Sequence, residues 1–443
     1  MNCGNATRCL SGEKSMANKK KVFQGKRVLV LGANPETVSL VVKAREMGCF
    51  TVVTDYNHDA MAKRYADKAL DVDASDVEAL ERVVRDEHID GILLGVAEAL
   101  SISYCRLCAR MGMPCFATEE LFALLTDKRR FKDVCRQYGV PVVPEYDVTG
   151  QNGSENVEFP VVVKPVDGCS SKGISICRNK QELDDGVQKA LSFSRQKQIL
   201  VERYMDKGEV VIYYVFQDGE PTFLAMCDRY TNKEQDGVAQ LPTAYIFPSR
   251  FTSMYERKID SRVGEMFRGI GIKNGVMFIQ SFVDETGNVF FYEPGYRLNG
   301  AQEHIILSRV IGIDAKELLV RYALTGRVSE AVLSQVKRSF SEVACKFSPL
   351  VKEGVIAKIE GIEEIRRQPE VVAVQPSYKP GDKVEGFGTL RQIVTRIYLV
   401  ADNYAKLFSA MRRIYSLLRV EDEFGQNMLL GFTDLGMLEK IYE

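Results

Sequence analysis

Short apolar runs alternate with amphipathic segments over the first quarter of the chain. The run at 27–33 is apolar and rich in β-branched residues, which predicts a buried strand, and similar runs follow at 50–55 and 89–95. Apolar residues at helical spacing predict helices over about 76–87 and 98–111. Regular alternation of strand and helix predicts an open parallel sheet, because consecutive parallel strands need a helical crossover.

The first turn of this sheet tests for a dinucleotide site. Asp55 ends the second strand, where an acid could bind a ribose, but after Gly32 the chain continues with Ala33, Asn34 and Pro35. The second and third glycines that admit a pyrophosphate are missing, and Asn34-Pro35 instead suits the start of a helix. A sheet whose loops contact a substrate is favoured, with dinucleotide binding as the alternative.

The pattern changes in the middle of the chain, where strands with tight turns outnumber helices. We predict a basic helix at 119–138 and further helices at 256–270 and 314–325. Strands are predicted at 159–165, 173–178, 198–202 and 210–216, with a hairpin turn at Asp218-Gly219 and a second hairpin at 275–293. Residues 231–250 are predicted to form a polar mobile loop. The last hundred residues mix strands and helices and predict a further domain.

Composition narrows the class of protein. The 443 residues include 59 Lys plus Arg and 60 Asp plus Glu, and a net charge of -1 offers no footprint for nucleic acid or an anionic membrane. No apolar stretch approaches 18 residues, and the N-terminus lacks the apolar core of a secretory signal, so we expect a cytoplasmic protein. Met16 is a candidate start, and residues 1–24 are expected to be a disordered extension.

The 11 cysteines are scattered through apolar runs, which predicts reduced thiols in the core. Cys105 and Cys108 form a CxxC pair inside a helical pattern, and the whole chain has only three histidines. A packed helix is therefore favoured over a metal or redox site at this pair.

A first polar cluster follows the predicted strand that contains Lys164. A loop of small residues then leads to the next strand, and it includes Gly168, Ser170, Ser171, Lys172 and Gly173. Such a loop can turn successive backbone N–H groups inward around an anion, and the lysines add charge for phosphate. The order of residues is not that of a P-loop, and a surface hairpin is the alternative.

A second cluster joins two strands further along the chain. It begins with Glu202, Arg203 and Tyr204 and ends at Glu209. A connector of this kind can offer backbone groups to a purine edge and carboxylates to amino or ribose hydroxyl groups. Surface salt bridges are the alternative.

The hairpin at 275–293 carries the third cluster. With a four-residue turn over 284–287, Val283 would pair with Asn288, and Gln280 and Glu293 would be diagonal neighbours on one face. Two oxygen-bearing side chains at that separation can share a hard cation such as Mg²⁺. The alternative is a Glu293–Arg297 ion pair.

The order and spacing of these clusters resemble the ATP-grasp superfamily, from residue 25 to about 330. Leu125-Thr126-Asp127-Lys128 looks like the helix start with the first phosphate-binding lysine, and Val163-Lys164-Pro165 like the strand with the second. Residues 168–173 look like the flap over the phosphates. The segments that contain Glu202 and Glu209 look like the adenine hinge and the ribose acceptor.

The hairpin and its continuation complete the resemblance. Gln280 and Glu293 match the metal-ligand pair of the family, and Arg297 matches the arginine beside the reacting centre. Gly295 departs from the family pattern Glu-x-Asn-x-Arg, because it cannot ligate a metal through a side chain; a water or Asn299 would fill that place. Residues 354–390 resemble the C-terminal domain of the carboxylase-like and amino-acid-ligase branch.

The resemblance implies an α/β fold in three parts. These are a Rossmann-like domain at 25–117, a two-lobed ATP-grasp domain at 118–335 with a mobile lid at about 140–203, and a mixed C-terminal domain at 336–443. It implies an ATP-dependent carbon–nitrogen ligase that uses Mg²⁺ or Mn²⁺, acts on a small carboxylate and an amine through an acyl phosphate, and forms a homodimer.

Two alternatives remain from the sequence. One is a carboxylase or carbamoyl-phosphate-synthetase-like subunit that uses bicarbonate, although four positions after Arg297, where biotin carboxylase has its catalytic glutamate, this chain has Ala301. The other is an ATP-binding regulator that has lost catalysis. Arg229, Tyr230 and Arg250 are expected substrate contacts.

Overall fold

The computed structural model describes residues 22–148, 156–166, 173–205, 208–232, 241–328, 340–430 and 434–443. Four of the predicted phosphate-loop residues, Gly168, Ser170, Ser171 and Lys172, lie outside these ranges, as do the expected N-terminal extension up to residue 21 and positions 233–240 of the predicted polar loop.

The N-terminal region forms a parallel sheet in the order β3-β2-β1-β4. Its strands are β1 (Arg27–Leu31), β2 (Phe50–Thr54), β3 (Lys68–Leu70) and β4 (Gly91–Leu94), and its helices are α1 (Val38–Glu46), α2 (Val77–Asp86) and α3 (Ser101–Met111). The three predicted strands are confirmed as neighbours in a parallel sheet, because β1 pairs in parallel with both β2 and β4. The short edge strand β3 gave no clear apolar run.

The first helix begins later than the Asn34-Pro35 signal suggests. A 3₁₀ turn, Pro35–Thr37, comes first, and the Asn34 side chain contacts the Thr37 hydroxyl instead of a backbone N–H. The predicted basic helix at 119–138 is in fact two helices, α4 (Glu119–Thr126) and α5 (Lys128–Gln137). Asp127 separates them, because its side chain accepts hydrogen bonds from Arg129 N and Arg130 N, both at 3.0 Å, and caps α5.

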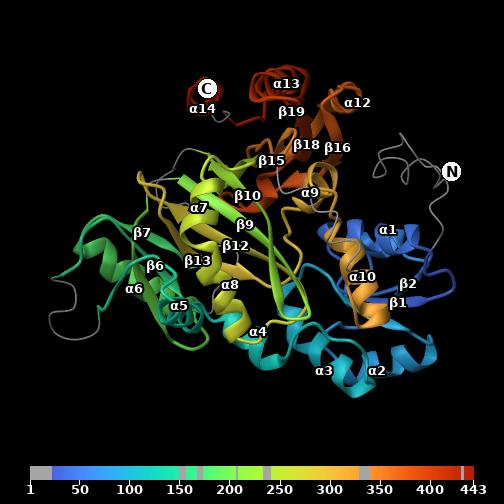
Figure 1. Cartoon of the computed structure of the whole chain (residues 1–443). Helices are drawn as coiled ribbons and strands as arrows, with labels where there is room; N and C mark the ends of the chain where they lie inside the picture. Colours follow the sequence, from blue (N-terminus) through green and yellow to red (C-terminus); the bar gives the residue numbers. More distant parts are fainter. Residues whose placement is uncertain are drawn as a thin grey trace.

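A small lobe follows, in which α6 packs on an antiparallel sheet of order β5-β8-β6-β7. Its elements are β5 (Glu145–Tyr146), β6 (Val161–Pro165), β7 (Ser175–Cys177), α6 (Lys180–Phe193) and β8 (Ile199–Arg203). Figure 1 shows this lobe in green at one side of the molecule, with α5 along its inner edge. The lobe has its own small core, which includes Val161, Val163 and Leu183.

The centre of the molecule is an eight-stranded antiparallel sheet of order β13-β12-β9-β10-β11-β14-β18-β16. Its strands are β9 (Gly208–Gln217), β10 (Glu220–Thr231), β11 (Pro242–Phe247), β12 (Gly275–Val283), β13 (Val289–Gly295), β14 (Val343–Phe347), β16 (Val371–Pro376) and β18 (Thr395–Ala401). The sheet continues through the predicted domain boundary at 335/336, because β14 pairs with β11.

Helices cover this sheet and connect it to the N-terminal region. They are α7 (Thr252–Lys258), α8 (Asp260–Gly269), α9 (His304–Val310), α10 (Ala315–Thr325), α12 (Ile362–Arg366), α13 (Tyr404–Leu417) and α14 (Leu435–Tyr442). A second small sheet in the C-terminal region consists of β17 (Lys383–Val384), β15 (Gly354–Glu360) and β19 (Arg419–Asp422). No helix of the described ranges is long and apolar enough to cross a membrane.

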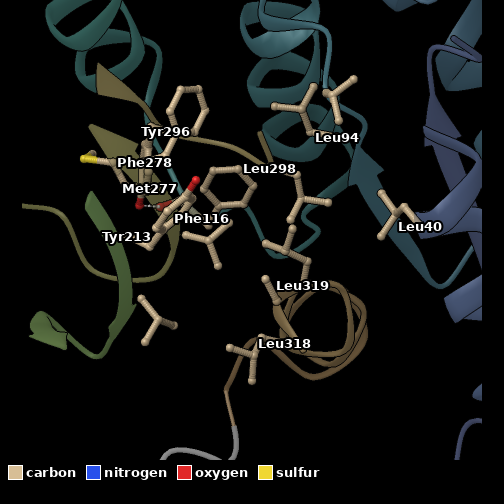
Figure 2. Packing of buried hydrophobic residues seen from close by; sticks show 14 of the residues in the cluster. Leu40, Leu94, Phe116, Tyr213, Met277, Phe278, Tyr296, Leu298, Leu318 and Leu319 are labelled. Carbon is tan, nitrogen blue, oxygen red and sulfur yellow. Dashed lines mark hydrogen bonds between the residues drawn. The ribbon is translucent and has the colours of Figure 1, made fainter. Parts of the chain in front are cut away.

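The N-terminal sheet and the central sheet share one hydrophobic core. Helix α10 packs against β4, α1 and β12, so it lies between the two sheets. Figure 2 shows Leu319 of α10 beside Leu298, and the aromatic side chains of Phe116 and Tyr296 belong to the same core. The two regions are therefore packed as one unit around this core.

The hairpin of β12 and β13 has a different register from the predicted one. Val283 pairs with Val289, not with Asn288, because the loop between them is one residue longer than predicted, with Gly287 at a positive φ of 79° and the Asp284 side chain accepting a hydrogen bond from Asn288 N. A bulge then shifts the pairing between Gln280 and Ser281, so Gln280 lies directly opposite Glu293. The predicted diagonal placement of these two residues is wrong.

Candidate active site

Two of the predicted phosphate-binding lysines project from neighbouring elements. Lys128 is the first residue of α5, Lys164 lies on β6, and both are buried. The Lys128 Nζ lies 3.4 Å from Glu293 Oε1, and the Lys164 Nζ lies 2.7 Å from Glu202 Oε2. The structure thus brings the helix start, the lobe strand and the hairpin carboxylate together, as the resemblance implies.

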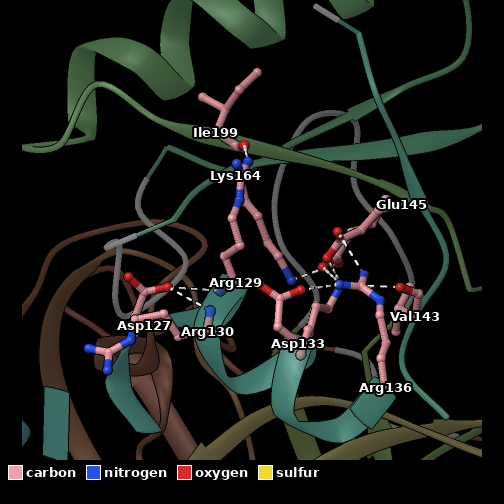
Figure 3. A network of polar contacts seen from close by, with 11 residues as sticks. Asp127, Arg129, Arg130, Asp133, Arg136, Val143, Glu145, Lys164 and Ile199 are labelled. Atoms are coloured by element: carbon pink, nitrogen blue, oxygen red, sulfur yellow. Dashed lines mark hydrogen bonds and ion pairs between the residues drawn. The ribbon is translucent and has the colours of Figure 1, made fainter. Parts of the chain in front are cut away.

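A third lysine, Lys132, belongs to the same cluster and was missed in the sequence. It is one helical turn after Lys128 on α5 and fully buried; its Nζ lies 2.7 Å from Glu145 Oε1, contacts Glu202 and donates to the Val143 carbonyl at 3.1 Å. Figure 3 shows this network, with Lys164 and Glu145 among its labelled residues. Spacing of i, i+4 from Lys128 was the signal available.

The charges of this cluster control one another. Burial lowers the pKa of Lys164, and the positive charges of Lys132 and Lys128 lower it further, while Glu202 acts in the opposite direction. Burial by itself would raise the pKa of Glu202, but Lys164 and Lys132 hold that pKa below its usual value. The three lysines share this cluster with the carboxylates of Glu202, Glu145 and Glu293. Positive charges gathered at one place suit a polyanion, because bound phosphates would offset the repulsion between the lysines.

The predicted ribose acceptor Glu209 is also paired. It lies on β9 and forms an ion pair with Arg229 of β10, and the Tyr292 hydroxyl donates to it at 3.3 Å. The Tyr292 ring lies 5.8 Å from the Lys164 Nζ, which connects Glu209 to the phosphate cluster. Glu202 and Glu209 are therefore both paired with basic side chains of the protein.

The remaining residues of the predicted nucleotide hinge lie at the end of β8. The Arg203 side chain is exposed, and its backbone N donates to the Pro144 carbonyl at 3.0 Å. The Tyr204 backbone N donates to the Pro160 carbonyl at 3.1 Å. Gly173, the one described residue of the predicted flap, is buried with a positive φ of 76° at the start of the strand after the loop.

The two predicted metal ligands face each other across the hairpin. Gln280 of β12 is the direct cross-strand partner of Glu293 of β13, and both side chains are half-buried. A carboxylate and an amide oxygen on adjacent strands are the hard donors that Mg²⁺ or Mn²⁺ prefers, and the pair fits such an ion. Within the described part of the chain, no group of three His, Cys, Asp or Glu side chains is arranged to hold a metal ion.

Phe278 gives a physical reason for Gly295, the departure from the family pattern. Gly295 lies opposite Phe278 in the hairpin, and a Cβ at position 295 would overlap the Phe278 ring. The same ring lies 5.3 Å from the guanidinium carbon of Arg297. The space where an asparagine would project is therefore filled by an aromatic ring that supports the arginine.

Arg297, the predicted catalytic arginine, connects the hairpin to the N-terminal sheet. One of its terminal nitrogens donates to Glu98 Oε2 at 3.0 Å, the other donates to the Leu298 carbonyl at 3.1 Å, and its Nε has no partner among the described residues. Glu98 lies shortly after the carboxyl end of β4. The alternative ion pair between Glu293 and Arg297 is not formed, because each has another partner.

A row of directly paired residues extends from this site across the central sheet. It runs over β12, β9, β10, β11, β14 and β18 as Phe282, Glu209, Arg229, Tyr245, Lys346 and Tyr398. Directly opposite residues of antiparallel strands share one face, so all six side chains lie on the face of the sheet that carries Glu209. We call this set the transverse row.

Only one of the three expected substrate contacts belongs to this face. Arg229 is in the transverse row, whereas its neighbour Tyr230 alternates to the opposite face. There the Tyr230 hydroxyl donates to the Tyr442 hydroxyl at 3.2 Å, and Tyr442 donates to Asp228 at 2.5 Å. Arg250 approaches the same Asp228 at 3.8 Å. Tyr230 and Arg250 thus form a second polar group apart from the transverse row.

Glu303 is the other site residue that the sequence did not reveal. It directly precedes α9, six positions after Arg297, and is fully buried. Neither of its carboxylate oxygens has a hydrogen-bond partner among the described residues. A buried acid thus lies two positions after Ala301.

The family comparisons agree with this geometry. Residues 127–331 match the family described as carbamoyl-phosphate synthase L chain, ATP binding domain, and residues 346–423 match L-amino acid ligase C-terminal domain 2. Among solved structures, the L-amino acid ligase from Bacillus licheniformis superposes with a TM-score of 0.75 at 18% identity, over 90% of this chain and 99% of that one.

Two curated relatives match this chain over part of their own length. The chain is 25% identical to the 2-oxoglutarate carboxylase small subunit of Hydrogenobacter thermophilus over 328 residues, which cover 68% of this chain and 67% of the relative. The biotin carboxylase domain of that enzyme, in complex with MgADP, ADP and bicarbonate, superposes with a TM-score of 0.71 at 19% identity, over 89% of this chain and 90% of that one. A formate-dependent phosphoribosylglycinamide formyltransferase from Prochlorococcus marinus is 26% identical over 187 residues, which are 41% of this chain and about half, 47%, of the relative.

The family models that match this chain, the curated relatives and the solved structures to which it is similar are ATP-dependent ligases of the ATP-grasp family. ATP and Mg²⁺ are the usual cofactors of this family. The α/β fold expected from the sequence is confirmed, and so is the resemblance on which it rested. The individual assignments of residues to nucleotide and metal remain predictions.

Proposed function

We propose that this ATP-grasp protein is a ligase that activates a carboxylate as an acyl phosphate and transfers the acyl group to an amine, with release of ADP and phosphate. The observation that carries the proposal is the meeting of Lys128 with Glu293 at 3.4 Å, beside Lys164 and the directly opposed Gln280. Separate parts of the chain would thus supply cations for phosphate and oxygen ligands for a metal at one place.

Each residue of the site has a distinct task in this proposal. Lys128 and Lys164 would bind the phosphates, and their charge would offset the charge that develops during phosphoryl transfer. Gln280 and Glu293 would hold the divalent cation, which supplies neutralisation of phosphate oxygens when bound. Arg297 would orient the carboxylate nucleophile and then stabilise the oxyanion of the adduct with the amine. No side-chain nucleophile is required, because the substrate carboxylate attacks the γ-phosphorus.

A screen for acid-dependent and amine-dependent ADP release tests this function. Purified protein with ATP and Mg²⁺ is incubated with L-amino acids and small acids, alone and in pairs, and ADP and phosphate are measured. Release that requires both an acid and an amine supports a ligase. ATP binding without ADP release for any pair would instead identify a regulator that has lost catalysis.

The variant Lys164→Met gives the sharpest test of the site. We expect a fall in ATP turnover of at least about 100-fold, the scale of losing one transition-state charge contact. Lys180→Met, an exposed lysine on α6 of the same lobe, is the matched control and is expected to keep full activity. Near-normal turnover in Lys164→Met would remove Lys164 from the phosphate site.

Use of bicarbonate as the carboxylate is the second candidate. The similarity to a 2-oxoglutarate carboxylase subunit and the buried acid at Glu303 favour it. ADP release that depends on bicarbonate, measured in degassed buffer with and without added bicarbonate, separates this function from ligation of an organic acid.

A further inference from the structure

Three thiols lie together where α3 meets the loop that leads to α4. Cys105 and Cys108 lie one helical turn apart on α3 and are buried, and Cys115 follows in the loop and is half-buried. The Cys115 Sγ lies 3.6 Å from the Cys105 Sγ, so the two sulfurs are in van der Waals contact. The closest described partner of Cys105 is thus a thiol that the folding of the loop brings to it, outside the CxxC pair.

Oxidation is the chemistry that this arrangement favours. In the ranges that the structure describes, no trio of potential metal ligands, these thiols included, is arranged to hold a metal ion. The Cys105 and Cys115 sulfurs need to approach by only about 1.5 Å to form a disulfide. Cys115 is the more reactive of the two, because it is the more exposed and because hydrogen bonds with Cys105 and Cys108 lower its pKa against the effect of burial.

The thiols also hold the backbone of the loop. The Ala117 carbonyl accepts a hydrogen bond from the Cys105 thiol at 3.3 Å, and the Cys115 Sγ lies 3.0 Å from the same oxygen. A disulfide has no S–H group, so its formation would remove the hydrogen bond from Cys105. Loss of a donor to a carbonyl in the interior is unfavourable, and we expect the loop to shift when the disulfide forms.

The same loop is bonded to the residue that precedes the predicted catalytic arginine. The Tyr296 hydroxyl donates to the Phe116 carbonyl at 2.9 Å, and the two rings pack edge to face with their centroids 5.1 Å apart. The Tyr322 hydroxyl of α10 donates to the Cys115 carbonyl at 3.1 Å. Arg297 directly follows Tyr296, so a shift of the loop would reach Arg297 through one peptide bond.

We propose that Cys115 and Cys105 form an oxidative modification site, in which hydrogen peroxide converts the two thiols to a disulfide and the disulfide lowers the activity of the candidate active site. The effect on activity rests on the proposed ligase function, whereas the existence of the modification site does not.

The atoms and electrons of the oxidation balance. The Cys115 sulfur attacks one oxygen of hydrogen peroxide: an S–O bond forms, the O–O bond breaks, and the second oxygen leaves as water with the thiol proton. The Cys105 sulfur then attacks the sulfenic acid: the S–S bond forms, the S–O bond breaks, and a second water leaves with the Cys105 proton. The two thiols lose two electrons in total, and the peroxide gains them. A dithiol reverses the oxidation by thiol–disulfide exchange.

A peptide map tests the pairing directly. Trypsin places the three thiols on three separate peptides, 86–106, 107–110 and 111–128. Purified protein is treated with a small excess of hydrogen peroxide, the remaining thiols are alkylated under denaturing conditions, and the tryptic peptides are identified by mass spectrometry. We expect a linked pair of 86–106 with 111–128 that disappears after treatment with dithiothreitol.

Turnover of ATP with the acid and amine found by the substrate screen tests the effect on the site. Oxidation of the wild-type protein is expected to lower turnover by at least about threefold, because small displacements of a positioned group slow a reaction steeply, and dithiothreitol is expected to restore it. Cys115→Ser cannot form the disulfide and should keep its turnover in peroxide. Cys108→Ser is the matched control and should form the disulfide and respond as wild type does.

The outcomes that overturn the inference are distinct. A link between 111–128 and 107–110, or no link to 111–128 at all, would overturn the modification site. The expected link with unchanged turnover, or an equal loss of turnover in Cys115→Ser, would overturn its effect on the active site. If the proposed function fails, the wild-type protein shows no turnover with any acid and amine, and the peptide map still decides whether the modification site exists.

Discussion

Acidic and basic residues of the candidate site neutralise one another in pairs. Lys164 is paired with Glu202, and Arg297 with Glu98. Buried ion pairs of this kind often add little to stability, because desolvation offsets their attraction. Their presence around the predicted phosphate site is therefore better explained by function: the acids hold the cations in place until substrates replace or extend the contacts.

Glu293 is the predicted metal ligand that a single substitution can test. Its carboxylate has the Lys128 ammonium at 3.4 Å and Gln280 as its cross-strand partner. Glu293→Gln removes the negative charge and keeps the shape, so we expect ATP turnover to need at least about tenfold more Mg²⁺ for half-maximal rate, because a neutral amide is a weaker ligand for a hard cation. A Mg²⁺ titration of activity measures this, with Glu285→Gln in the exposed turn of the same hairpin as control. Superimposable titration curves would argue against a metal at Glu293.

The β12–β13 hairpin is the element that positions the two predicted metal ligands, Gln280 and Glu293. Its bulge brings Tyr292 and Glu293 to the same face, since Tyr292 contacts Phe282 and Glu293 opposes Gln280. Its last residue, Gly295, leaves room for the Phe278 ring. The bulge and the glycine are departures from regular strand geometry, and both act on residues of the site.

Replacement of Gly295 tests the packing of this element. Gly295→Asn would restore the family side chain but place a Cβ within the Phe278 ring, so we expect a loss of about 1–3 kcal/mol in the free energy of unfolding. Urea denaturation measures the loss. In a Phe278→Ala background the same substitution should cost clearly less, because the obstructing ring is absent. Equal costs in both backgrounds would contradict this account of Gly295.

At the scale of the whole molecule, the parallel N-terminal sheet presents acids to the central sheet. Glu98 follows β4 and pairs with Arg297, and Glu36 follows β1 and pairs with Arg396 of β18 at 2.9 Å. Both acids come after the carboxyl ends of parallel strands, where loops of such sheets usually contact ligands. The N-terminal region thus completes the site from one side.

The Glu36–Arg396 pair measures the coupling between the two regions. In a double-mutant cycle with Glu36→Ala and Arg396→Ala, we expect a coupling energy of about 0.5–3 kcal/mol in the free energy of unfolding, because the half-buried pair connects residues 360 positions apart. Lys406→Ala with Asp402→Ala, an exposed pair at the start of α13, serves as the comparison and should couple by less than about 0.5 kcal/mol. Additive single effects at Glu36 and Arg396 would mean that this contact does not hold the regions together.

Much of the fold could be predicted because short-range order determines it. The apolar runs that became β1, β2 and β4 and the Asp218-Gly219 turn depend on neighbours within a few residues, so periodicity and turn chemistry were enough. The places where prediction failed were also local. Asp127 divided a helical pattern by capping, and a loop one residue longer than predicted changed the register of the hairpin that carries Gln280 and Glu293.

The sequence by itself determined the type and order of many elements and pointed to Lys128, Lys164 and Glu293 as candidate site residues, because short apolar runs and turns depend on near neighbours in the chain. The tertiary structure alone decided that Lys132 joins the cluster around Lys164, that six strands align the transverse row, and that Glu303 is buried. The physical reason is that cross-strand pairing and burial of charge arise between segments up to hundreds of residues apart, where no local period or spacing records which side chains will meet.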